Sequence, residues 1–234
     1  MIQWTKSIIK SAFPGGGPLW RRKGALQRAV NTPPPSLEKI FSDIYLQNSW
    51  ADPESVSGRG STLARTEVIR RELPRLLAGF GAKSLLDAAC GDFNWMQHID
   101  LGAVEYMGVD IVPELIAQNQ IVHGREGRKF LALDITRDRL PKADVILCRD
   151  CFIHLSFQDT RAAITTFQQS GADFLLATTH ITVRENTDAP SGAWRSVNLQ
   201  LSPYGFPEPL QVLFEDPELG KGLGLWRLAD LSIQ

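Results

Sequence analysis

The chain has 234 residues, of which 43% are hydrophobic and 22% are charged, and its formal net charge is −1. This length is enough for one α/β domain with a well-buried core and too short for two large domains. The near-zero net charge argues against a nucleic-acid partner, and no apolar run approaches the ~18 residues of a membrane span. The three cysteines are few and odd in number, so we expect a cytoplasmic protein without a disulfide framework.

Residues 1–36 differ from the rest of the chain because they carry six basic residues and no acidic one. Glycines 15–17 and prolines 33–35 interrupt this segment twice. We predict a basic N-terminal arm whose candidate contacts are an anionic partner or a membrane surface. The alternative is a leader that is mobile or packs on its own domain. Residues 37–234 are predicted to form the folded domain.

The first predicted helix covers residues 37–50, with Ser36 as its N-cap and an apolar stripe on one face. A polar, glycine-containing loop follows at 55–61. A second helix is expected over 62–80, closed by Gly81, with a kink or break at Pro74 because proline removes a backbone donor inside a helix.

From residue 84 onward, apolar strands alternate with helices. Strands that are apolar throughout and separated by helices indicate a parallel sheet covered on both faces. The predicted fold class is α/β: a Rossmann-like, mostly parallel seven-stranded sheet with helices on both faces and a C-terminal antiparallel hairpin. The strands are expected at 84–89, 105–110, 129–135, 143–148 and 174–179, with helices near 113–121 and 158–170, and the hairpin strands at 210–214 and 222–228.

The first strand runs into a turn of small residues, Asp87-Ala88-Ala89-Cys90-Gly91-Asp92, and the second strand ends at Asp110. Asp110 lies 23 positions after Asp87 (110 − 87). Nucleotide-binding α/β folds place an acid on a ribose at a spacing of roughly 20 residues. Small residues let a ligand approach the backbone, so we expect the turn to present its N–H groups. The pattern predicts a cofactor that contains adenosine.

A mainly parallel sheet that ends in an antiparallel hairpin, with an acidic small-residue loop after its first strand, resembles the class I S-adenosylmethionine (SAM)-dependent methyltransferases. The resemblance covers about residues 57–230. More narrowly, four stretches resemble a bacterial methyltransferase group of undefined substrate: Ser57-Gly58-Arg59-Gly60-Ser61, Cys90-Gly91-Asp92-Phe93-Asn94-Trp95, Gly108-Val109-Asp110-Ile111 and Cys148-Arg149-Asp150-Cys151-Phe152-Ile153-His154-Leu155. The resemblance implies SAM as the cofactor and a SAM-dependent methyltransferase domain at 37–234. We expect methyl transfer to a small-molecule or glycan-like acceptor, at oxygen.

In that family the first strand ends in an acid followed by a Gly-x-Gly-like turn. Asp87 matches the acid and Gly91 the central glycine, whereas Ala89 and Phe93 occupy the flanking glycine positions. These two substitutions alter the predicted shape of the loop around the methionine part of the cofactor.

The resemblance also implies which residues surround the cofactor. The loop at 57–61 would close over the methionine carboxylate, or else serve only as a linker. Asp110 would accept from the ribose hydroxyls, and it is also a candidate N-cap for the following helix. The implied cofactor-binding residues are Ser57, Gly58, Gly60, Ser61, Asp87, Ala89, Gly91, Asp92, Asp110, Ile111, Asp134, Ile135 and Arg149, the last with either the cofactor carboxylate or an anionic acceptor as its target.

Three residues near the ends of the fourth and fifth strands are candidate catalytic groups. Methyl transfer depends mainly on positioning, with proton removal added for an oxygen nucleophile. Asp150 would orient or deprotonate the acceptor, and His154 and His180 are rival bases. His154 lies in an apolar run, which is also typical of a packed, hydrogen-bonded histidine.

A polar and aromatic segment at 181–206 is predicted to supply the acceptor pocket, with an ordinary surface loop as the alternative. The segment has no clear helix or strand period. Its candidate residues are Arg184, Asn186, Trp194, Arg195, Asn198 and Tyr204.

Other functions remain open at this point. A nicotinamide-dependent oxidoreductase would need a Gly-x-Gly-x-x-Gly loop, which is absent from 87–93. A catalytically silent methyltransferase-like partner subunit would use the basic arm for docking. Cys90, Cys148, Cys151 and His154 form a candidate zinc set, but a metal there would compete with the cofactor for space, so we predict no metal.

Overall fold

The computed structural model describes residues 34–232. The first of the chain's two units ends at Pro35. The predicted basic arm at 1–36 therefore lies almost wholly outside the described residues and stays a prediction. Within the described residues, no helix combines the length and the hydrophobicity that crossing a membrane requires.

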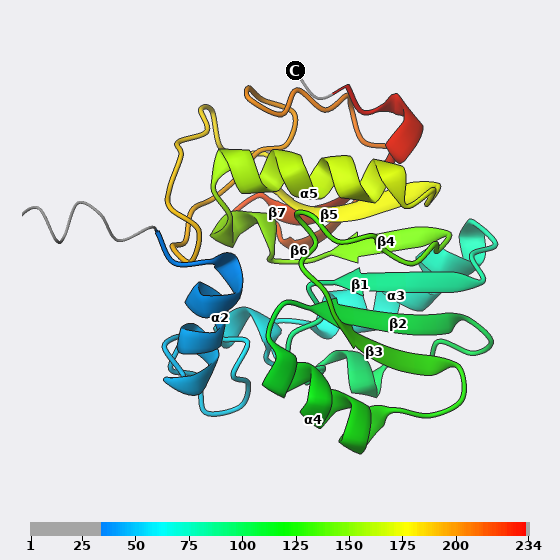
Figure 1. Ribbon diagram of the computed structural model, residues 1–234. Helices are drawn as coiled ribbons and strands as arrows, with labels where there is room; N and C mark the ends of the chain where they lie inside the picture. The colour runs from blue at the N-terminus through cyan, green and yellow to red at the C-terminus, as the bar shows by residue number, and fades with distance from the viewer. Residues whose placement is uncertain (1–33, 233–234) are drawn as a thin grey trace, which may run out of the picture. The chain divides into compact units, whose positions relative to one another are not determined.

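The second unit is built on one sheet with the strand order β3-β2-β1-β4-β5-β7-β6 (Figure 1). The strands are β1 Ser84–Ala88, β2 Glu105–Asp110, β3 Arg128–Ala132, β4 Val145–Cys148, β5 Phe174–His180, β6 Gln211–Asp216 and β7 Lys221–Arg227. Strands β1 to β5 pair in parallel, while β7 pairs antiparallel with both β5 and β6. The predicted fold class is confirmed. Strand β3 is shorter than predicted, so Asp134 and Ile135 follow the strand instead of ending it.

The helices are α2 Leu37–Leu46, α3 Glu67–Gly79, α4 Pro113–His123 and α5 Phe157–Gln169. Ser36 caps α2 as predicted, because its hydroxyl accepts from the backbone N–H of Lys39 at 3.2 Å. The predicted extension of α2 to residue 50 is wrong, since Asn48 adopts a left-handed φ of 44°. The predicted start of α3 at residue 62 is also wrong, and the helix runs through Pro74 without a break.

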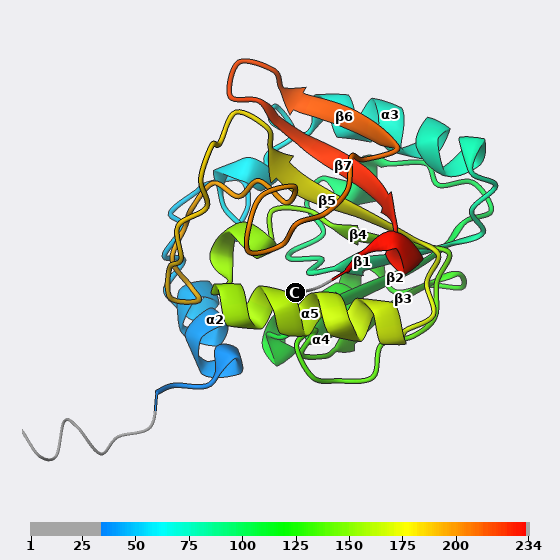
Figure 2. The same cartoon turned by 90° about the horizontal axis from the view of Figure 1, so that it is seen from above.

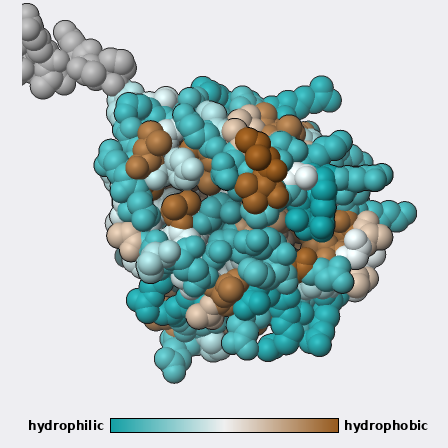
Figure 3. All heavy atoms as spheres, turned by 90° about the horizontal axis from the view of Figure 1, so that it is seen from below, coloured by the Kyte–Doolittle hydropathy of each residue, from teal (hydrophilic) through white to brown (hydrophobic). Residues whose placement is uncertain are grey.

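Two hydrophobic cores cover the two faces of the sheet, with α3 and α5 on opposite sides (Figure 2). Ile164 and Phe167 of α5 are fully buried in one core, and Ile69 and Leu73 of α3 are buried in the other. The face shown in Figure 3 carries its hydrophobic residues as small separate groups among hydrophilic ones. Because both sheet faces are covered, a ligand reaches the sheet at the strand ends.

Candidate active site

A cavity of about 670 Å³ opens at the carboxyl ends of β1, β2 and β4. Its volume falls in the range of small-molecule and cofactor sites. The walls come from α2, the loop at 55–61, the turn after β1, the segment after β4 and the β6–β7 hairpin. A second hollow of about 530 Å³ lies at the amino ends of β2 and β3, and none of the candidate site residues lines it.

Almost all of the residues that the sequence predicted for the site line this one cavity. They are Ser57, Gly58, Gly60, Ser61, Asp87, Ala89, Gly91, Asp110, Ile111, Asp134, Ile135, Arg149, Asp150, His154 and His180. Asp92 is the exception. Its carboxylate accepts from the Ser55 hydroxyl at 2.8 Å, and its backbone N–H donates to the Ser57 hydroxyl at 2.9 Å. Asp92 therefore holds the loop at 55–61 against the turn after β1.

Asp87 lies in the floor of the cavity at the end of β1 and is 2% exposed. The Tyr106 hydroxyl donates to its carboxylate at 2.8 Å. Burial raises the pKa of Asp87 to about 7, although the Tyr106 hydrogen bond and the charge of Arg149 oppose the rise. Near neutral pH this carboxyl group is therefore divided between its protonated and ionised forms.

Asp110 ends β2 beside the turn after β1. Its two carboxylate oxygens accept from the backbone N–H groups of Gly91 and Val112, each at 3.1 Å. Burial raises its pKa, and these backbone hydrogen bonds oppose the rise. An ionised carboxylate has about four lone-pair sites, so the bonds to Gly91 and Val112 leave acceptor capacity for a ligand.

The turn after β1 uses its own N–H groups inside the protein. Cys90 donates to the Val109 carbonyl at 2.9 Å, while Gly91 and Asp92 donate to Asp110 and Ser57 as described. The expectation that the turn presents its N–H groups to a ligand is thus wrong for these three residues. Gly91 has φ +56°, and a side chain there would overlap the Ser57 hydroxyl, so only glycine fits.

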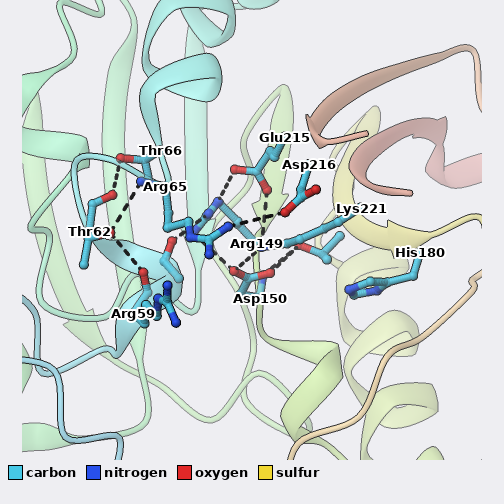
Figure 4. Close-up of polar contacts among 12 residues, drawn as sticks. Arg59, Thr62, Arg65, Thr66, Arg149, Asp150, His180, Glu215, Asp216 and Lys221 are labelled. Atoms are coloured by element: carbon cyan, nitrogen blue, oxygen red, sulfur yellow. Dashed lines mark hydrogen bonds and ion pairs between the residues drawn. The ribbon is translucent and has the colours of Figure 1, made fainter. Parts of the chain in front are cut away.

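Four charged side chains of the cavity wall form a largely buried charge cluster: Arg149, Asp150, Glu215 and Lys221 (Figure 4). Arg149 Nε lies 2.8 Å from Glu215 Oε1, and Lys221 Nζ lies 2.7 Å from Asp150 Oδ2. Sequence reasoning missed Glu215 and Lys221, because they lie on the hairpin more than 60 residues along the chain. Only the predicted pairing of the hairpin strands with the sheet pointed toward this region.

The charge cluster alters two predicted roles. Arg149 also donates to the Gly60 carbonyl at 2.8 Å, so its guanidinium is already satisfied within the protein. For Asp150, burial alone would raise the pKa, but the charges of Arg149 and Lys221 outweigh burial and lower it to about 2. A carboxylate with such a low pKa is a poor proton acceptor near neutral pH. Asp150 is thus suited to orienting groups and not to deprotonating them.

The two candidate histidines have different surroundings. His154 Nδ1 lies 3.2 Å from the Ala193 carbonyl, and its ring lies 4.9 Å from that of Trp50. A carbonyl only accepts, so this contact favours a proton on Nδ1 and leaves Nε2 as a proton acceptor. His180 is more buried and is bound to the backbone of Val197. Burial lowers the pKa of both histidines, which are therefore neutral at pH 7.

The segment at 181–206 contributes less to the cavity than predicted. Only Trp194 of its six candidate residues lines the cavity, and this side chain is 64% exposed. Asn186 donates to the Asn198 carbonyl at 2.8 Å, and Arg195 donates to the Tyr204 hydroxyl at 3.1 Å. These polar side chains hold the segment itself together.

The sequence analysis did not assign the apolar residues of α2 to the site, although it identified their apolar stripe. The apolar stripe of α2 contributes Leu37, Phe41, Ile44 and Tyr45, and the turn after α2 contributes Trp50. The sequence showed this stripe on one helix face, but an apolar stripe is equally typical of packing against a core.

The candidate zinc set does not assemble. In residues 34–232, no group of three or more His, Cys, Asp or Glu side chains is placed to hold a metal ion. Cys90 and Cys148 are buried free thiols, and Cys151 is a partly buried one.

No protein-family model and no curated protein sequence matches the chain. A solved structure that resembles it is Burkholderia thailandensis 1,6-didemethyltoxoflavin-N1-methyltransferase with bound 1,6-didemethyltoxoflavin and S-adenosylhomocysteine. The two share 16% identity and a TM-score of 0.50, over 93% of this chain and 92% of that one. Human N-acetylserotonin methyltransferase in complex with SAM matches at 14% identity and a TM-score of 0.51, over 89% of this chain and 66% of that one.

At these identities the likeness shows the fold alone: this chain shares its predicted α/β fold with two methyltransferases that were solved with SAM or S-adenosylhomocysteine. The strand order also separates this chain from the dinucleotide-binding oxidoreductases. Their order is 3-2-1-4-5-6, whereas here an antiparallel β7 lies between β5 and β6.

Proposed function

We propose that this chain is a SAM-dependent methyltransferase that methylates a small-molecule acceptor at oxygen. The observation that carries the proposal is the position of Asp110, which lies at the end of β2 in the same cavity as Asp87 and is bound to the Gly91 N–H. Gly60 and Gly91 allow the loop at 55–61 to pack closely against the turn after β1 and the segment after β4. A side chain at Gly91 would overlap Ser57, and one at Gly60 would lie 2.8 Å from an Asp150 oxygen.

The residues around the cavity suit the parts of SAM. Asp110 would accept from the ribose hydroxyls, Ile111 would pack near the adenine, and Asp134 with the Ile135 N–H would meet the adenine edge. When bound, SAM supplies a methyl carbon on a sulfonium sulfur, and the carbon–sulfur bond breaks with its electron pair left on sulfur. The chain's own residues would then remove the proton and orient the acceptor.

We assign the cofactor carboxylate to Arg59 in place of Arg149. Arg149 is bound to Glu215 and the Gly60 carbonyl. Arg59 also lines the cavity and is exposed, and among residues 34–232 its guanidinium has no recorded ion pair. A free cation in the loop at 55–61 is the partner that a carboxylate needs.

We assign proton removal to His154 and acceptor orientation to Asp150. Both histidines contact a backbone carbonyl through Nδ1, and neither has a hydrogen-bond partner at Nε2 among residues 34–232. We choose His154 because its ring lies 4.9 Å from that of Trp50, an aromatic residue that also lines the cavity. A glycan-like acceptor remains the alternative to a small molecule. We further propose that the reaction takes place in the cytoplasm, that no nucleic acid takes part, and that the arm at 1–36 contacts an anionic partner or a membrane surface.

Isothermal titration of the full chain with SAM, S-adenosylhomocysteine and NAD tests the proposal. We expect micromolar binding of the first two and no measurable binding of NAD, because the loop that cradles a pyrophosphate is absent. NAD binding that is tighter than S-adenosylhomocysteine binding would establish the oxidoreductase alternative. No binding of any of the three would leave the silent partner subunit.

A further inference from the structure

Six apolar or aromatic side chains form one wall of the cavity, here called the apolar wall: Leu37, Phe41, Ile44, Tyr45, Trp50 and Trp194. Helix α2 has no buried residue, although one of its faces is apolar. A ten-residue helix is marginal in water by itself and depends on covering its apolar face. The apolar wall is thus half-covered hydrophobic surface that faces a cavity.

The apolar wall is joined to His154 by several contacts. The Gly192 N–H donates to the His154 carbonyl at 2.8 Å, and the Trp50 ring lies 4.9 Å from the His154 ring. Helix α2 packs against the same place, because a side chain at Gly192 would meet Ile40 at 2.7 Å and Ile44 at 3.5 Å. The wall and the proposed base are therefore one assembly, and a molecule on the wall lies beside His154.

The apolar wall offers no partner for a charge and few for a hydroxyl-rich molecule. None of its six members is charged. Its polar side-chain groups are the Tyr45 hydroxyl, which donates and accepts, and the two tryptophan N–H groups, which only donate. Among the charged side chains of the cavity, Arg149 and Lys221 are paired with Glu215 and Asp150. Arg59 is the cation that we assign to the cofactor carboxylate. Burying a charge or several hydroxyls without partners costs free energy. A flat apolar ring covers the wall without that cost, and it also forms favourable stacked or edge-to-face pairs with the aromatic members of the wall.

The proposed base points to the same class of acceptor. Burial lowers the pKa of His154, so its neutral imidazole is a weak base. A phenol hydroxyl, with a pKa of about 10 in tyrosine, loses its proton to such a base far more readily than an aliphatic or sugar hydroxyl does.

We infer that the acceptor is a flat, uncharged aromatic compound with a phenolic hydroxyl, held on the apolar wall beside His154. The inference rests on the proposed methyltransferase function and specifies its acceptor. It selects a phenol over the glycan-like alternative.

Binding to the full chain saturated with S-adenosylhomocysteine tests the inference without turnover. The probes are 2-naphthol, its anionic relative 6-hydroxy-2-naphthoate and methyl β-D-glucopyranoside, compared by saturation-transfer NMR and calorimetry. We expect 2-naphthol to bind at least tenfold more tightly than the other two. Phe41→Ala and Trp194→Ala should each weaken 2-naphthol binding at least threefold, and they should leave S-adenosylhomocysteine binding unchanged.

Leu46→Ala is the matched control, because Leu46 lies on the same helix, is 67% exposed and does not line the cavity. It should change neither affinity. Tighter binding of the glucoside or of the naphthoate, or equal 2-naphthol affinity in all variants, would overturn the inference while the cofactor result stands. A chain that fails to bind S-adenosylhomocysteine at all would overturn the proposed function and the inference together.

Discussion

The two halves of the cavity are built in different ways. On the side that we propose binds the cofactor, Asp87 and Asp110 are buried and hydrogen-bonded to fixed partners. On the side that we propose binds the acceptor, the α2 residues are only partly covered and Trp194 is 64% exposed. One half is therefore organised before any ligand binds, whereas the other half presents apolar surface that a ligand would cover. The charge cluster lines the same cavity.

The largest loss of stability is expected at the charge cluster, and it tests whether this cluster is part of the organised half. Arg149→Ala leaves Glu215 buried without its main partner, so we expect a loss of about 3–5 kcal/mol in the free energy of unfolding. Arg65→Ala is the control, because Arg65 and Asp216 form an exposed pair that is worth about 0–1 kcal/mol. Urea unfolding followed by circular dichroism measures both losses. Equal losses would mean that the buried cluster has no special role in the fold.

A smaller effect is expected from Gly91→Ala, which tests the organised half directly. The added methyl group would overlap the Ser57 hydroxyl and push the loop at 55–61 away from the turn. We expect the dissociation constant for S-adenosylhomocysteine to rise about 10- to 100-fold, roughly 1.4–2.8 kcal/mol. Gly102→Ala is the control. Both glycines have φ +56°, so the backbone strain is matched, but no atom lies within 4 Å of a Cβ at Gly102. If both variants bind equally well, the contact between the loop and the turn does not shape the site.

The smallest effect is a pH dependence caused by Asp87. Its pKa of about 7 in the folded protein lies above its ordinary value of 3.8, so the folded state binds more protons between these values. The free energy of unfolding should therefore fall as pH rises through 7, by about 1 kcal/mol between pH 6 and pH 8. Asp87→Asn should remove this part of the slope, because the amide oxygen still accepts from Tyr106 but does not titrate. Equal slopes in both proteins would show that Asp87 is ionised throughout.

The sheet and the cofactor half were predictable because both follow from local patterns. Continuous apolar strands specify a parallel sheet, and a small-residue turn with Asp110 at the next strand end is visible within 24 residues (110 − 87 + 1). The errors there concern element ends, such as the end of β3 before Asp134, where local turns compete with the strand.

The acceptor half was harder to predict because it depends on contacts between distant segments. Lys221 meets Asp150 across 71 positions of sequence, and this contact removes Asp150 as a base. The Trp50 ring and the Ala193 carbonyl come to lie beside the His154 ring only after the chain has folded. No local sequence pattern encodes contacts between such distant residues. The sequence therefore identified Asp150 as a candidate residue but not the ion pair that lowers its pKa.

Titration of S-adenosylhomocysteine into Asp110→Ala tests whether Asp110 binds the adenosyl group. Glu105→Gln is the control, because Glu105 is an exposed carboxylate at the opposite end of the same strand. If the carboxyl ends of the parallel strands bind the adenosyl group, Asp110→Ala should raise the dissociation constant at least 100-fold and Glu105→Gln should leave it unchanged. Wild-type affinity in a folded Asp110→Ala protein would show that Asp110 does not bind the adenosyl group.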